Sequence, residues 1–86
     1  MKLKQVFKKY AGKIVILQPA MRDAATGKAL SFKVLKECYS VQEAVSSRGY
    51  YHTEGFEGVF LYPCVEDAAI PPEETARMFR VLYGRE

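Results

Sequence analysis

The sequence predicts a small α+β domain in which three helices pack on a three-stranded, mostly antiparallel sheet, in the order αββαβα. Two observations lead to this prediction. Apolar residues recur at helical spacing near both ends of the chain, and three segments between those ends are β-branched or alternate in strand fashion. With 86 residues and no Pro/Gly/Ser-rich linker, we expect residues 1–86 to form a single domain.

The first helix is predicted over residues 2–10, and Gly12 is expected to end it. Its polar positions are filled mainly by lysine. The apolar positions follow i, i+3, i+4, i+7 spacing and are Leu3, Val6, Phe7 and Tyr10.

A β-hairpin is predicted to follow, from residue 13 to about residue 39. The run Ile14–Leu17 is apolar on both sides and rich in β-branched residues, which indicates a buried strand that Pro19 weakens. Residues 23–28 form the expected turn, where Gly27 can adopt a positive φ. Alternating apolar residues predict the second strand, and they are Leu30, Phe32 and Val34.

Residues 28–48 permit two interpretations. Apolar residues from Leu30 to Val45 also recur at steps of three and four, as they would in one long helix. We favour a strand followed by a short helix over residues 41–48, because Ser40 and Glu43 have the spacing of a capping box and Gly49 offers a stop. The long helix remains the alternative.

The closing segments are a strand over residues 59–65 and a helix that begins at Pro72. Pro63 indicates an edge position or the end of the strand. Proline suits the first helical position, and Gly84 is the expected stop. We expect helices to cover one face of the sheet, with Phe79 and Leu82 of the closing helix in the core.

Three short motifs carry a resemblance to known proteins. Tyr10-Ala-Gly-Lys13 opens the hairpin, Ser40-Val-Gln-Glu-Ala44 begins the second helix, and Arg48-Gly-Tyr50 follows. Together they resemble small uncharacterised prokaryotic domains that combine a Tyr-x-Gly-Lys hairpin, a Ser-x-x-Glu-Ala helix and a closing strand. The resemblance covers residues 10–65. It favours the hairpin interpretation and implies no activity, and this chain differs by a longer hairpin connection and a glycine-rich insert after Tyr50.

Composition argues against several functional classes. Cys38 and Cys64 are isolated from each other and from the single histidine, His52, so we expect buried thiols, no metal, no cofactor and no enzymatic activity. No long apolar run or secretory signal is present, and a cytoplasmic protein without a membrane partner is expected.

Two binding functions remain. The leading hypothesis is a protein-interaction or accessory module that binds another protein or itself, because six tyrosines and five phenylalanines are available as anchors. The alternative is sequence-tolerant nucleic-acid binding at the basic N-terminal region, with Tyr10, Tyr50 or Tyr51 stacking on bases. The candidate residues for protein binding are Tyr50, Tyr51, Phe56, Met78 and Tyr83, and those for nucleic acid are Lys4, Lys8, Lys9 and Lys13.

Overall fold

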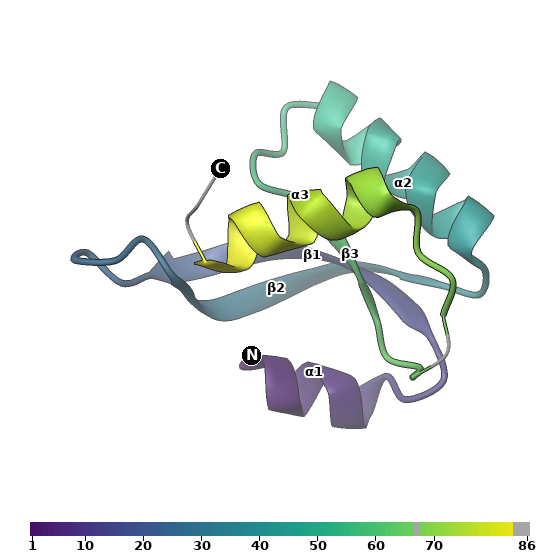
Figure 1. The fold of residues 1–86 in the computed structure, drawn as a ribbon, viewed down its shortest axis with the longest axis horizontal. Helices are drawn as coiled ribbons and strands as arrows, with labels where there is room; N and C mark the ends of the chain where they lie inside the picture. The colour runs from purple at the N-terminus through teal and green to yellow at the C-terminus, as the bar shows by residue number, and fades with distance from the viewer. Residues whose placement is uncertain (67, 84–86) are drawn as a thin grey trace.

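A three-stranded antiparallel sheet with the spatial order β2-β1-β3 organises the fold (Figure 1). The computed structural model describes residues 1–66 and 68–83. The predicted order αββαβα and the α+β class are confirmed. The predicted stop at Gly84 lies outside the described residues. In chain order the elements are α1 (Leu3–Lys9), β1 (Ile14–Arg22), β2 (Ala29–Cys38), α2 (Val41–Thr53), β3 (Phe60–Pro63) and α3 (Pro72–Tyr83).

The central strand is β1, and its first four residues, Ile14–Leu17, are all buried as predicted. The strand then continues through Pro19 to Arg22, so the expectation that Pro19 weakens it is wrong. The reason is positional. Beyond Leu17, β1 pairs with β2 alone. The N–H group that a proline lacks is therefore not needed for a hydrogen bond to β3.

The hairpin turn forms where it was predicted. The backbone N–H of Asp23 donates to the carbonyl of Lys28 at 2.8 Å, and that of Gly27 donates to the carbonyl of Asp23 at 2.8 Å. Gly27 has a φ of 74°, which an L side chain rarely adopts. The Oδ1 atom of Asp23 also accepts from the N–H groups of Ala25 and Thr26, and these bonds lower the pKa of that carboxyl.

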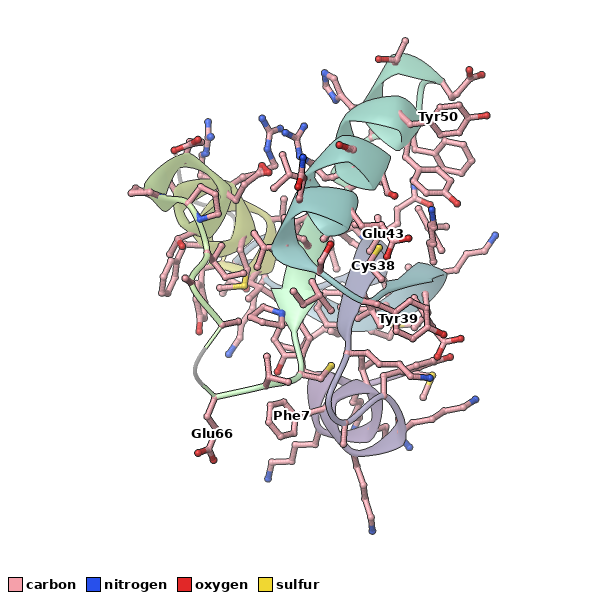
Figure 2. All side chains as sticks on the ribbon, turned by 90° about the vertical axis from the view of Figure 1, so that its right-hand side faces the viewer. Phe7, Cys38, Tyr39, Glu43, Tyr50 and Glu66 are labelled. Atoms are coloured by element: carbon pink, nitrogen blue, oxygen red, sulfur yellow. The ribbon has the colours of Figure 1, made fainter. Side chains whose placement is uncertain are left out.

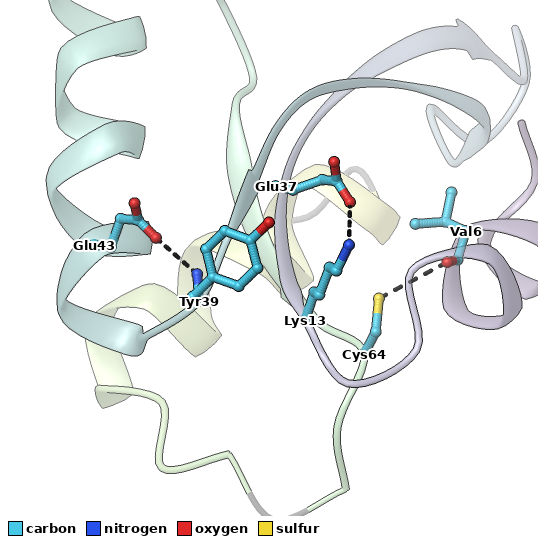
Figure 3. Close-up of polar contacts among 6 residues, drawn as sticks. All are labelled: Val6, Lys13, Glu37, Tyr39, Glu43 and Cys64. Carbon is cyan, nitrogen blue, oxygen red and sulfur yellow. Dashed lines mark hydrogen bonds and ion pairs between the residues drawn. The ribbon is translucent and has the colours of Figure 1, made fainter.

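Residues 28–48 form a strand and then a helix, as favoured. The hydroxyl of Ser40 accepts from the N–H of Glu43 at 3.1 Å, which is half of the predicted capping box. The other half is wrong. The Glu43 carboxylate accepts at 2.7 Å from the N–H of Tyr39, one residue before the cap, instead of from Ser40 (Figure 3).

The helix α2 runs through Gly49 and ends at Thr53, so the predicted stop at Gly49 is wrong. A glycine inside a helix costs only about 1 kcal/mol relative to alanine. The packing of Ala44 and Tyr51 against the sheet outweighs that cost. As a result Tyr50 and Tyr51, which lie beyond the predicted end of the helix, are helical, and the positive φ of 92° is found at Gly55.

Helices lie on both sides of the sheet, so the expectation that they cover one face is wrong (Figure 1). One face packs Ile14, Ile16 and Leu61 against Ala44 of α2. On the other, Val15, Leu17 and Phe60 form a cluster with Val6 of α1 and Leu82 of α3. The physical reason is that both faces of β1 are apolar and both need to be shielded from water.

The third strand is shorter than the predicted range of residues 59–65, and its side chains alternate between the two faces of the sheet. It spans Phe60–Pro63, at an edge of the sheet, and it ends at the proline. Val59 and Leu61 belong to the cluster under α2, whereas Phe60 and Cys64 belong to the other cluster. The alternation read from residues 59–65 therefore holds on both sides of the strand.

The buried face of the last helix, α3, differs from the apolar face that its sequence indicates. Its inward stripe is spaced i, i+4, i+7, i+8 and consists of Glu74, Met78, Val81 and Leu82. Leu82 is core as predicted, but Phe79 is 52% exposed, so its assignment to the core is wrong. The buried Glu74 is the cause, because its ion pair with Arg48 of α2 turns that side of the helix inward.

Candidate functional site

The aromatic residues predicted to bind a partner fall into two separate groups. Tyr50, Tyr51 and Phe56 form a chain of edge-to-face rings, with centroids 5.5 Å and 5.2 Å apart. Tyr50 is 61% exposed, whereas Tyr51 and Phe56 are half-buried and pack against the cluster under α2. The Tyr51 hydroxyl donates to the carbonyl of Leu35 at 3.3 Å. Of this group, Tyr50 is the ring available to a partner.

The second group lies on α3. Met78 packs against the core cluster, while Tyr83 is exposed and stacks on Phe79 with centroids 5.6 Å apart and an interplanar angle of 24°. The Nζ atom of Lys28, in the hairpin turn, lies 5.8 Å from the centroid of the Tyr83 ring. Tyr83 therefore lies at the end of α3 beside the hairpin turn, whereas Tyr50 lies on α2.

The lysines predicted to bind nucleic acid differ in what they contact. Lys4 and Lys8 are exposed on α1, and Lys9 is exposed with its Nζ 5.6 Å from the centroid of the Tyr10 ring. Lys13 is already engaged. Its Nζ lies 2.7 Å from Oε1 of Glu37, and this carboxylate raises the pKa of the Lys13 ammonium (Figure 3).

The outer edge of β2 is a feature that the sequence analysis missed. At Phe32 this edge pairs with the backbone of Met1, through bonds of 2.9 Å and 2.7 Å. Within the described residues, the stretch from Lys33 to Glu37 has no further backbone partner beyond β1. Sequence alone gave no signal for this edge, because which strand lies at the edge depends on the sheet order.

A hollow of about 360 Å³ lies between this edge and α2. Its lining residues are Lys36 of β2 and Ser46, Ser47, Tyr50 and Tyr51 of α2. Inside it, Nζ of Lys36 donates to Oγ of Ser47 at 3.1 Å. Tyr39, which is 76% exposed, follows β2, and Nζ of Lys13 lies 5.7 Å from the centroid of its ring; Figure 2 shows Tyr39 near the start of α2 and Tyr50 near the opposite end of that helix. The hollow thus combines a lysine ammonium, two serine hydroxyls and two tyrosine side chains beside a strand edge.

A β-bulge places two lysines on the same side of this edge. Lys33 pairs with Gln18 and Lys36 with Ile16, whereas Leu35 has no partner on β1. Residues two apart on β1 point to the same face. Lys33 and Lys36 therefore both lie on the face that α2 covers, which a regular strand with this spacing would not allow.

A second hollow, of about 270 Å³, lies between the turn after α2 and α3. It is lined by both basic and acidic side chains, including His52, Glu57 and Arg77, and by Phe56. Phe56 therefore lines this hollow and also packs against the core cluster under α2.

The two cysteines are free and buried, as predicted. Burial raises the pKa of both thiols, and the Sγ atom of Cys64 lies 3.9 Å from the carbonyl oxygen of Val6 (Figure 3). A thiol with a raised pKa is a poor nucleophile at neutral pH. Within the part of the chain that the structure describes, no three His, Cys, Asp or Glu side chains are grouped to hold a metal ion.

Comparisons with protein-family models, with curated proteins and with solved structures find no significant match to this chain. Among residues 1–66 and 68–83, no helix has both the length and the apolar character needed to cross a membrane. The chemistry of the β2 edge is therefore the main guide to function.

Proposed function

We propose that the protein is a non-enzymatic protein-binding module that accepts an extended segment of a partner as an additional strand on the outer edge of β2. One observation carries the proposal: among the described residues, the outer edge from Lys33 to Glu37 has no backbone partner besides β1, and it lies next to a hollow walled by α2. Of its carbonyl groups, that of Leu35 accepts from the Tyr51 hydroxyl. Unpaired N–H and C=O groups of an edge strand are a template for strand addition, and adjacent pockets provide specificity for side chains.

One exposed tyrosine supplies an anchor. Tyr50 lines the hollow and is 61% exposed, and tyrosine is among the residues that contribute most binding energy at interfaces. Of the residues that the sequence suggested, Tyr50 stays at the centre of the proposal. Tyr51 packs against Tyr50, and its hydroxyl donates to the carbonyl of Leu35 on β2, which fixes the position of this pair of rings.

The first test uses the complete chain and peptides selected from a random nine-residue display library. A selected peptide should shift the amide resonances of residues 33–37. N-methylation of every second peptide residue should abolish binding in one register and be tolerated in the other, because alternate N–H groups of an added strand face the edge. If no selected peptide perturbs these amides, or if both registers tolerate methylation, strand addition is wrong.

A pair of exposed tyrosines provides the matched variants. Tyr50→Ala should lower the affinity for the selected peptide by about tenfold, which is typical of the loss of an interface anchor. Tyr83→Ala removes an exposed ring on α3 and should leave the affinity unchanged. Equal effects of the two substitutions would argue against a site at α2.

A second candidate function has its own observation. Lys4, Lys8 and Lys9 are exposed on α1, and none of them has an acidic side chain within 4.0 Å among the described residues. Phe7, which is exposed on the same helix, offers a ring for base stacking. A surface of this kind suits a single-stranded nucleic acid without sequence preference.

Fluorescence anisotropy with a labelled 20-nucleotide oligothymidine tests this second function. Binding should fall steeply as salt rises from 50 mM, and Lys8→Glu with Lys9→Glu should weaken it, because each lysine that contacts a phosphate releases a counterion. Lys28→Glu, in the hairpin turn, is the control. Absence of binding at 50 mM salt excludes this function.

A further inference from the structure

The geometry points to an acidic occupant of the β2 edge: we infer that the bound segment carries two carboxylate side chains separated by one residue, one of which enters the hollow and meets Lys36. This inference rests on the proposed strand addition and adds the chemistry of the partner to it.

The first argument is the state of the Lys36 ammonium. Its Nζ donates to Oγ of Ser47, and no acidic side chain lies within 4.0 Å of it among the described residues. An ammonium has three donors, so two remain for a ligand. A carboxylate is the acceptor that forms the strongest bond with them. The rings of Tyr50 and Tyr51 border the same hollow and suit the aliphatic part of a glutamate side chain.

The second argument is that the acids near this edge are already engaged. The carboxylate of Glu37 is bonded to Lys13 at 2.7 Å, and that of Glu43 accepts from the N–H of Tyr39. Lys33 and Lys36 have no such acidic partner in the described part of the chain. The edge therefore presents positive charge to an incoming strand.

The third argument fixes the spacing of the two carboxylates. The bulge at Leu35 places Lys33 and Lys36 opposite Gln18 and Ile16, which are two residues apart on β1. A regular incoming strand repeats its facing every second residue. It would thus bring acidic residues at i and i+2 to the two lysines, which is a Glu-x-Glu or Asp-x-Asp pattern.

The same charges disfavour a second copy of this chain as the occupant. An antiparallel pair of β2 strands would bring Lys33 and Lys36 of one copy to the face that carries Lys33 and Lys36 of the other. Like charges across a strand pair are destabilising, and edge lysines are a common device against self-pairing.

The test is a double-mutant cycle on the best selected peptide and the complete chain. Replacing the acidic peptide residue by glutamine should lower the affinity for the wild-type chain about tenfold or more, since hydrogen bonds to charged groups have this magnitude. With Lys36→Gln the two peptides should bind equally. Lys28→Gln, a lysine outside the edge, should preserve the difference.

The outcomes separate this inference from the function on which it rests. Selected peptides that shift the residue 33–37 amides but lack acidic residues at i and i+2 would overturn the acidic occupant and leave strand addition intact. The same holds if the acidic peptide keeps its advantage with Lys36→Gln. If no peptide shifts those amides, strand addition fails and the inference fails with it. If oligothymidine displaces the peptide and shifts the same amides, the ligand of this edge is a nucleic acid and the acidic peptide is wrong.

Discussion

The Nε atom of Arg48 on α2 lies 2.8 Å from Oε2 of Glu74 on α3. Glu74 is only 2% exposed, and its second oxygen lies 3.6 Å from Nε of Arg77. The buried carboxylate is thus hydrogen-bonded to Arg48 of α2, whereas Arg77 of its own helix is near enough for an ion pair but forms no hydrogen bond with it. The arrangement fixes how α3 is rotated, because Glu74 must face α2 for the pair to form.

Arg48→Met should lower the free energy of unfolding by about 3 kcal/mol, because it leaves a buried carboxylate without its closest partner. Urea denaturation at pH 7 measures this. Lys13→Met breaks the exposed Lys13–Glu37 pair and should cost less than about 1 kcal/mol. The double substitution Arg48→Met with Glu74→Leu should recover most of the loss. If Arg48→Met costs no more than Lys13→Met, the buried pair does not stabilise the fold.

Gly49→Ala should stabilise the protein by about 0.5–1 kcal/mol, because Gly49 lies inside α2 and a Cβ there meets nothing within 4 Å. Gly12→Ala is the matched control. A Cβ at Gly12 also meets nothing, but its φ of 86° strains any L side chain, so that substitution should destabilise by about 1 kcal/mol or more. Thermal and urea unfolding compare the two, and a destabilising Gly49→Ala would show that α2 does not continue through residue 49.

The stability that Asp23 contributes should depend on pH. Hydrogen bonds from Thr26 and Ala25 lower the pKa of its carboxyl from the ordinary value of 3.8. The unfolded chain therefore takes up the proton at a higher pH than the folded chain does. The contribution is fully present above about pH 3.8 and is lost as the pH falls through the folded-state pKa. The difference in unfolding free energy between wild type and Asp23→Asn should shrink from pH 5 to pH 2, and a constant difference would contradict this.

Cys38 and Cys64 should react slowly with iodoacetamide at pH 8 while the protein is folded. Both thiols are buried and have a raised pKa, so alkylation requires local opening of the structure. In guanidinium chloride both should react at the rate of an ordinary thiol. Ala76→Cys, on the exposed side of α3, provides a fast-reacting control in the native state. Fast labelling of Cys38 or Cys64 in the native protein would contradict their burial and make a cysteine-dependent activity a candidate function.

The order of elements could be predicted because local patterns determine it. The buried run Ile14–Leu17, the turn at Asp23–Lys28 and the alternation over residues 59–65 each depend on residues close in sequence. The extent of α2 could not be predicted, because the packing of Tyr51 against the sheet decides whether the helix passes Gly49.

The site was only partly predictable for a related reason. Tyr50 was identified as a candidate and is exposed. Met78, expected at the surface, packs against the core, and Phe79, expected in the core, is exposed, because the buried Glu74 determines which side of α3 faces inward. Lys36 was missed altogether. Its importance depends on β2 lying at the edge of the sheet and on the bulge at Leu35, and neither feature leaves a local pattern in the sequence.

The central position of β1 has a kinetic consequence. Its pairing with β2 closes across a short turn, whereas its pairing with β3 joins Leu17 to Phe60 across a much longer loop with a larger entropic cost. The hairpin should therefore be formed in the folding transition state, and β3 should dock afterwards. In stopped-flow chevrons, Asp23→Ala, which removes hydrogen bonds inside the hairpin turn, should mainly slow folding, and Leu61→Ala in β3 should mainly speed unfolding. The opposite pattern would mean that β3 takes part in nucleation.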